Sequence, residues 1–207
     1  AGGQIRNSNL YVLSSLVDEL GCTALPLGNA RDERDELREK IIEGLSADML
    51  ITSGGVSVGK YDLVVDVMKE IGVDIRFWKV NIKPGMPLMF GLYGDCPVCG
   101  LPGNPVSSMV TFLQFIKPAL LRMQGQKIVE TGFTLRATLQ EDIRKADGKR
   151  HVVRGILARR KGALEVRTTG SQVSNLLSSL ADANCLIILP EGEGNFNMGA
   201  EVEVQLL

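Results

Sequence analysis

Apolar residues recur at helical or strand spacing through the first 126 residues, and the two kinds of segment alternate along the chain. Helical spacing predicts helices at about residues 10–20, 32–45, 61–71 and 110–124. Continuous apolar runs predict short strands at residues 22–27, 48–52, 73–82 and 98–101. Strands that alternate with helices are typical of a parallel sheet with helices on both faces. We therefore expect a doubly wound, mostly parallel α/β domain over residues 1–126.

The pattern changes after residue 126. Only residues 171–180 have helical spacing there, and several of the remaining apolar runs are separated by Gly or Asp-Gly turns. These runs predict strands at residues 134–139, 152–158, 163–168, 185–189 and 201–207. We expect a second, small all-β, barrel-like domain over residues 127–207.

Charge and hydropathy narrow the function classes. The 207 residues include 23 Lys or Arg and 24 Asp or Glu, so there is no electrostatic case for non-specific nucleic-acid binding. The longest apolar runs are far shorter than the roughly 20 residues of a membrane helix, and the first residues carry no secretory signal. We expect a cytoplasmic protein that acts on small molecules and binds neither nucleic acid nor a membrane.

Histidine and cysteine offer little chemistry. His151 is the only histidine, which excludes a His-based triad or a multi-His metal site within this chain. Cys96 and Cys99 form a Cys-x-x-Cys pair, but a structural zinc site would need a second pair. We interpret the pair as small residues of an apolar strand in a protein of a reducing compartment.

The first candidate binding loop, SGGVSVG, follows the strand predicted at residues 48–52. Paired glycines let backbone N–H groups converge, serines add hydroxyl donors, and the next helix presents its positive end, so a phosphate or other oxyanion fits. It is not a Walker loop, because no Gly-Lys-Ser/Thr follows, and glycine content alone is equally typical of a tight turn. The binding residues that we assign to it are Ser53, Gly54, Gly55, Ser57 and Gly59.

Asp62 follows this loop at the start of the next predicted helix. A carboxylate beside an anion site suggests a bridging divalent cation or an acid–base role. The alternative is a surface acid that complements the helix dipole.

The second candidate loop, LPGNPVS, has two prolines that make a strand-to-helix turn rigid. We assign binding roles there to Pro102, Gly103, Asn104, Pro105 and Ser107.

A third segment carries Lys79 and Lys83, four residues apart, which we expect on the same side of one extended segment. Their ammonium groups would neutralise a multiply charged substrate, and the alternative is a solvated strand edge.

The order of these segments is more specific than any one of them. TSGGVSVG (52–59), YD (61–62), KPG (83–85) and LPGNPVS (101–107), in this order, resemble the MoeA/gephyrin E-domain family of molybdopterin molybdenumtransferases. Residues 5–9 and 169–174 also look like parts of that family, so the resemblance covers essentially the whole chain. It implies a molybdopterin-binding α/β domain followed by a small terminal barrel.

The resemblance also implies an activity. Such an enzyme takes adenylylated molybdopterin and molybdate, inserts molybdenum at the dithiolene sulfurs and releases AMP, with Mg2+ as the usual divalent cation. By motif, Asp32 and Asp62 match acidic residues, to which we assign metal positioning, and Lys79 and Lys83 match basic residues suited to molybdate or phosphate charge. In the barrel, Arg154 and Ser174 match residues that face the same cleft.

Family members carry a preceding strand and two further amino-terminal domains that supply dimer contacts. We therefore expect these 207 residues to be part of a longer, homodimeric enzyme whose isolated fragment is inactive, with a molybdopterin adenylyltransferase as a possible substrate donor. Two alternatives stay open. The serine-glycine loop also occurs in molybdopterin adenylyltransferases, and gephyrin relatives act as receptor-clustering scaffolds.

Overall fold

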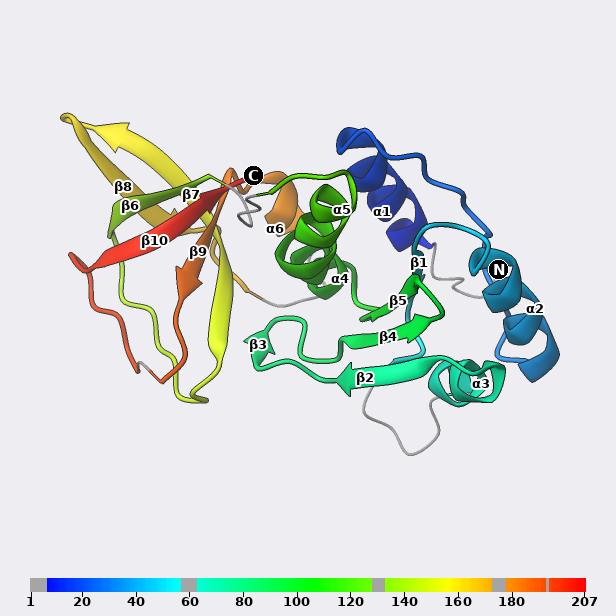
Figure 1. Cartoon of the computed structure of the whole chain (residues 1–207). Coiled ribbons are helices and arrows are strands. Elements are labelled where there is room, and N and C mark those ends of the chain that lie inside the picture. The colour runs from blue at the N-terminus through cyan, green and yellow to red at the C-terminus, as the bar shows by residue number, and fades with distance from the viewer. Residues whose placement is uncertain (1–6, 57–62, 128–132, 173–177, 193) are drawn as a thin grey trace, which may run out of the picture. The chain divides into compact units, whose positions relative to one another are not determined.

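The computed structural model describes residues 7–56, 63–127, 133–172, 178–192 and 194–207. The chain divides into two units. The α/β unit contains Ala1–Val80 and Gly85–Lys127, and the barrel unit contains Asn81–Pro84 and Ile128–Leu207. Figure 1 shows the elements of both units. None of the helices in the described ranges has the length and apolarity that crossing a membrane requires.

The sheet of the α/β unit is mixed. Its strands lie in the order β1 (Leu50–Ser53), β5 (Cys96–Leu101), β4 (Met89–Tyr93) and β2 (Asp74–Trp78). β1 runs parallel to β5, whereas β5 with β4 and β4 with β2 are antiparallel pairs. The expectation of a mostly parallel sheet was wrong, because β4 turns directly into β5.

A short turn makes the β4–β5 hairpin. Tyr93 pairs with Cys96, so only Gly94 and Asp95 connect the two strands, and Gly94 has a φ of +56°. Gly-Asp between two apolar runs is a hairpin signal, because glycine adopts positive φ without steric cost.

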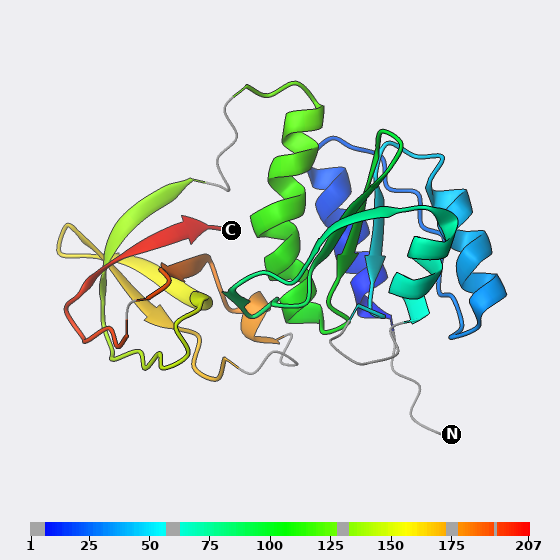
Figure 2. The same ribbon diagram turned by 60° about the horizontal axis from the view of Figure 1, so that its bottom comes forward.

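Helices cover both faces of this sheet, as expected. α1 (Ser8–Glu19) and α4 (Pro105–Thr111) lie on one face, and α2 (Arg34–Gly44) and α3 (Leu63–Ile71) lie on the other (Figure 2). The helices predicted at 10–20 and 32–45 are confirmed, with different ends. The helix predicted at 61–71 is confirmed over Leu63–Ile71, since residues 61 and 62 lie outside the described residues.

The strand predicted at residues 22–27 is wrong, because this segment has no regular secondary structure. Pro26 has no N–H to donate to a neighbouring strand. Side chains instead bond the backbone: Ala24 N–H donates to Asp18 Oδ1 at 3.1 Å, and Lys40 Nζ donates to Leu27 O at 2.5 Å.

One long helical segment follows β5. It runs through α4, the π-helical turn η1 (Phe112–Ile116) and α5 (Lys117–Met123). Lys117 N–H donates to Phe112 O, a bond one residue wider than in an α-helix. Pro118 lacks an N–H and its ring crowds the preceding turn, which accounts for the widened turn at this place.

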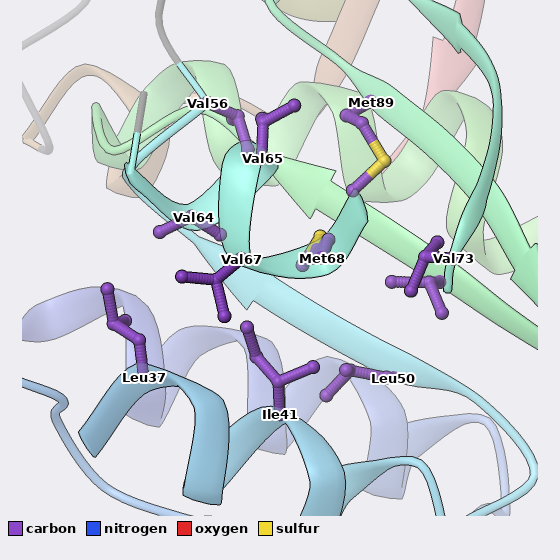
Figure 3. Packing of buried hydrophobic residues seen from close by; sticks show 11 residues of the cluster. Leu37, Ile41, Leu50, Val56, Val64, Val65, Val67, Met68, Val73 and Met89 are labelled. Atoms are coloured by element: carbon purple, nitrogen blue, oxygen red, sulfur yellow. The ribbon is translucent and has the colours of Figure 1, made fainter. Parts of the chain in front are cut away.

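One hydrophobic core of the α/β unit lies between the sheet and helices α2 and α3 (Figure 3). Leu37 and Ile41 of α2 face the apolar side of α3, and Leu50 and Met89 supply the strand side. Val56 of the first candidate loop belongs to the same cluster, so this packing holds the described end of that loop.

The barrel unit is a closed barrel, which confirms the barrel-like expectation. Its strands pair in the cycle β7–β8–β6–β10–β9–β7. They are β6 (Thr134–Leu139), β7 (Arg150–Arg160), β8 (Ala163–Thr168), β9 (Cys185–Leu189) and β10 (Glu201–Leu206). The described part of the helix predicted at 171–180 contains only the start of α6 (Ser178–Ala181), and residues 173–177 lie outside the described residues.

One further strand of the barrel sheet comes from the middle of the α/β sequence. β3 (Ile82–Lys83) pairs in parallel with β7, with Ile82 opposite Arg150 and Lys83 opposite His151. Arg150 N–H also donates to Asn81 O at 3.0 Å. The strand predicted at 73–82 is therefore two strands, β2 and β3, in two different sheets.

Candidate functional site

The two candidate loops begin side by side. β1 and β5 are parallel neighbours with Ser53 opposite Leu101, so both loops leave the same edge of the sheet. In open α/β sheets, ligands bind outside the carboxyl ends of the strands. The structure thus brings the described part of the first loop, 53–56, against the second loop, 102–105.

Glycine allows the close approach of these loops. A Cβ on Gly103 would lie 3.3 Å from the Cα of Gly54, so a side chain there would push the loops apart. Gly54 and Gly55 have φ values of +88° and +68°, which favour glycine. Gly54 N–H donates to Leu101 O at 3.0 Å, and Ser53 Oγ donates to Pro102 O at 3.3 Å.

Two residues of the second loop stabilise the start of the following helix, α4. Asn104 is the N-cap of α4, and its Oδ1 accepts from Val106 N–H at 3.2 Å and Ser107 N–H at 3.5 Å. Pro105 occupies the first helical turn, where a missing N–H costs nothing. Ser107 is buried, and its carbonyl accepts from Thr111 Oγ1 at 2.8 Å.

The exposed residues of the two loops include Ser53, Gly55 and Gly103. This surface offers backbone groups, whereas the Ser53 hydroxyl already donates its proton to Pro102 O. Such a surface suits an oxyanion or a polar heterocycle that backbone groups recognise. Ser57, Gly59 and Asp62 lie outside the described residues.

Sequence reasoning missed two supports of the loops. Asn9 of α1 donates from Nδ2 to both Ser53 Oγ and Gly103 O. Trp78 Nε1–H donates to Val56 O at 3.1 Å and anchors the backbone after Gly55. No local signal would have found these pairs, because the partners are 94 residues apart for Asn9 and Gly103 and 22 apart for Trp78 and Val56.

Lys79 and Lys83 do not share one extended segment, so the argument from their spacing was wrong. Lys79 is exposed and has a φ of +150°, which breaks the chain direction after β2. Lys83 belongs to β3 in the barrel unit. The reason is that the backbone after Val80 pairs with β7 instead of continuing β2.

Lys83 forms an ion-pair cluster within the barrel unit. Its Nζ lies 3.1 Å from Asp147 Oδ2, while Asp147 Oδ1 lies 2.6 Å from Nε2 of the buried His151. The hydrogen bond with His151, and then that with Lys83, hold the pKa of the Asp147 carboxyl well below its usual range. Asp147 is therefore ionised and gives the exposed Lys83 ammonium a counter-ion at neutral pH.

Arg154 is fully buried in the barrel unit. Its Nη2 donates to Ser171 O at 3.2 Å, and its N–H donates to Gln172 Oε1 at 3.0 Å. Burial lowers the pKa of the guanidinium, which nevertheless stays protonated because its ordinary pKa is so high. Arg154 thus contacts the turn that holds Ser171, while Ser174, the residue that the resemblance places with Arg154 at a cleft, lies outside the described residues.

Asp32 lies just before α2, because the helix begins at Arg34 and its N-cap is Glu33. The helix predicted at residues 32–45 thus begins two residues later than expected, and Asp35 and Glu36 occupy its first turn. Within the described ranges no three His, Cys, Asp or Glu side chains gather as a metal site would require. Mg2+ is usually held by one or two carboxylates together with substrate phosphates; Asp32 is the described residue to which that role is assigned, while Asp62 lies outside the described residues.

The four cysteines are free thiols. Cys99 is buried in β5, where burial raises its pKa to about 12, and burial also raises the pKa of Cys96. A thiol with a raised pKa is a weak nucleophile and metal ligand. This fits the interpretation of Cys96 and Cys99 as packing residues.

Two family models match the chain. The model described as a probable molybdopterin binding domain matches residues 1–122, and the model of the MoeA C-terminal region (domain IV) matches residues 136–207. This chain belongs to the MoeA family. The MoeA family membership confirms the resemblance found in the sequence.

Curated relatives of this MoeA-family chain carry the name molybdopterin molybdenumtransferase. The one from Haemophilus influenzae is 38% identical over 98% of this chain and 50% of its own length. The one from Bacillus subtilis is 35% identical over 99% of this chain and 48% of its own length. The MoeA-family chain therefore spans about half the length of these relatives.

Solved structures agree with the fold. A crystal structure of a molybdopterin biosynthesis MoeA protein from Pyrococcus horikoshii superposes with a TM-score of 0.82 at 28% identity, over 100% of this chain and 49% of that chain. A molybdenum cofactor biosynthesis protein from Pyrococcus furiosus superposes with a TM-score of 0.77 at 25% identity, over 97% of this chain and 65% of that chain.

Proposed function

We propose that this chain carries molybdopterin-binding and barrel parts of a molybdopterin molybdenumtransferase. The whole protein transfers molybdenum from molybdate to the dithiolene of adenylylated molybdopterin and releases AMP. The observation that carries the proposal is the pair of glycine loops closed against each other, Gly54 on Gly103, at the carboxyl edge of β1 and β5. Relatives at 38% and 35% identity with this name support it.

The residue roles rest on the resemblance, and for the loops also on backbone geometry. Ser53, Gly54, Gly55 and Gly103 present backbone groups to the substrate. Lys79 and Lys83 supply positive charge for molybdate or phosphate. Transfer of this kind depends on positioning and charge neutralisation more than on a nucleophilic side chain. The buried thiol of Cys99, whose pKa is raised, is a poor nucleophile, and this mechanism does not require a nucleophilic thiol.

The test is molybdate-dependent AMP release from adenylylated molybdopterin by the whole protein that carries this chain. We expect release by the wild type, its loss in Asp62→Asn, and a rise in the molybdate KM in Lys83→Gln. Lys161→Gln is the matched control, because Lys161 is an exposed lysine in the turn between β7 and β8. Comparison with the isolated 207-residue chain shows whether further domains complete the site.

Other outcomes would replace the proposal. Consumption of ATP with adenylylation of molybdopterin would assign the chain to the adenylyltransferases. If a folded whole protein turned over neither substrate but formed a stoichiometric, molybdate-independent complex with another protein, a scaffold function would replace the enzyme.

The metal, the assembly and the compartment stay predictions. Mg2+ dependence rests on Asp62 together with Asp32, and removal of divalent cations by a chelator is expected to stop AMP release until Mg2+ is restored. Homodimerisation is checked by light scattering of the whole protein. A molybdopterin adenylyltransferase is the expected donor of substrate, and the free thiols are in keeping with a cytoplasmic protein.

A further inference from the structure

Asn9 is a buried polar residue that the chemistry described above does not use. It is the second residue of α1, and only 7% of its surface is exposed. Few amides are buried this deeply without a specific hydrogen-bonding reason, because an unpaired buried amide is costly.

The donors of Asn9 join the two glycine loops. Nδ2 lies 2.6 Å from Ser53 Oγ in the first loop and 2.9 Å from Gly103 O in the second. A carbonyl oxygen only accepts, so Gly103 O fixes which end of the carboxamide is the nitrogen. Both amide hydrogens are therefore directed into the loops, one into each.

The Ser53 hydroxyl connects Asn9 to the second loop as well. Its hydroxyl accepts from Asn9 and donates its own proton to Pro102 O at 3.3 Å. One continuous set of donors thus runs from α1 through the first loop to the second. Asn9 Oδ1 is also buried, and no described residue donates to it, so the bonds that the described structure shows for Asn9 are made by its donors.

The loops need such a connection because glycines meet there. Gly54 and Gly103 approach through their Cα atoms, and neither has a side chain that fixes the distance between them. Gly54 has a φ of +88°, a conformation open to glycine among many others. Without a lateral link, each loop would be free to choose its own backbone conformation.

We propose that Asn9 is a positioning residue that holds the two loops as one binding surface for adenylylated molybdopterin. It acts through Ser53 and Gly103 and does not touch the reacting atoms. The substrate part of this inference rests on the proposed function, whereas the link between the loops rests on the hydrogen bonds alone.

The test compares Asn9→Ala with Asn7→Ala in the whole protein. Asn7 is the N-cap of the same helix, and its Oδ1 accepts from Leu10 N–H at 3.1 Å. Asn7→Ala therefore weakens α1 without removing a bond to either loop. Asn9→Leu is the second variant, because leucine keeps the shape of asparagine and fills its space if the alanine variant does not fold.

Two readouts are measured. Hydrogen exchange of peptides covering residues 50–56 and 101–106 is expected to speed up in the Asn9 variants by about tenfold, since two hydrogen bonds are lost, and to stay unchanged in Asn7→Ala. The KM for adenylylated molybdopterin is expected to rise by about tenfold in the Asn9 variants with a smaller change in kcat.

Unchanged exchange in both loops of a folded Asn9 variant would overturn the link. Faster exchange with an unchanged KM would overturn the role in substrate binding. If the wild-type protein neither binds nor turns over adenylylated molybdopterin, the proposed function fails, while the exchange experiment still decides whether Asn9 joins the loops.

Discussion

Gly100 on β5 packs directly against Val56, the residue that continues the first binding loop. A Cβ at Gly100 would lie 2.5 Å from Val56 Cγ1 and 3.3 Å from Met89 Cβ. Val56 and Met89 are both fully buried and cannot withdraw into solvent. The position of Val56 in the loop therefore requires that residue 100 on the neighbouring strand has no side chain.

Gly100→Ala is accordingly expected to lower the free energy of unfolding by about 1–3 kcal/mol through overpacking. Urea denaturation of the chain measures the change. Gly194→Ala is the matched control, because a Cβ there meets no atom within 4 Å. Equal stability of the two variants would contradict the packing argument.

Asp147 is expected to make the free energy of unfolding fall as the pH becomes acidic. Its folded pKa lies below the ordinary value of 3.8, mainly because of the hydrogen bond with His151. A carboxyl with a lowered pKa stabilises the fold above its unfolded pKa, and the contribution is lost as the pH falls through the folded value.

Between pH 6 and about pH 3, wild type is therefore expected to lose more unfolding free energy than Asp147→Asn. Urea midpoints at the two pH values measure the difference, and Asp182→Asn, at an exposed position, should behave like wild type. A wild-type profile no steeper than that of Asp147→Asn would show that Asp147 is not linked to folding.

At the scale of elements, the sequence predicted those whose signal is local. α1 follows from apolar spacing and the Asn7 cap, and β9 from the run Cys185–Leu189. β4 was missed although Gly94-Asp95 marks its turn, and the segment 22–27 resembled a strand only in composition. A strand forms only when it pairs with another strand, and that partner can lie far away in the sequence.

The N-cap of α4 gives a prediction at this scale. Asn104→Ala is expected to lower the free energy of unfolding by about 1 kcal/mol, since two N–H groups lose their acceptor. Asn104→Ser should recover most of it, because a serine hydroxyl also caps. Denaturant titration of both variants is the measurement, and an unimproved serine variant would point to a role other than capping.

For the whole molecule, the candidate residues are distributed over both units of the chain. Loop residues Ser53, Gly54 and Gly103 belong to the α/β unit, whereas Lys83 and Arg154 belong to the barrel unit. The sequence singled out these residues through loop motifs and the family resemblance, and their roles in binding stay predictions. Neither Lys83 in β3 nor the partners of Asn9 were predictable, because both depend on pairing across long stretches of chain.

A barrel fragment of residues 128–207 lacks β3, whose Ile82 is buried in the intact chain. Linking residues 80–85 to this fragment is expected to raise its unfolding free energy by about 1–3 kcal/mol, from the recovered backbone bonds with β7. Thermal and urea denaturation measure the gain. The same fusion with residues 80–85 replaced by glycine and serine is the control, and an equal gain from it would refute the contribution of β3.

The place of β3 in the chain also affects which gene recombinations would keep the barrel unit whole. The barrel unit is encoded in two separate stretches of the gene, with Asn81–Pro84 inside the part that encodes its neighbour. A single recombination breakpoint near residue 127 would transfer a barrel without one of its strands. The two units are therefore expected to be inherited together, and swapping one of them between relatives requires the codons of β3 to travel with the barrel.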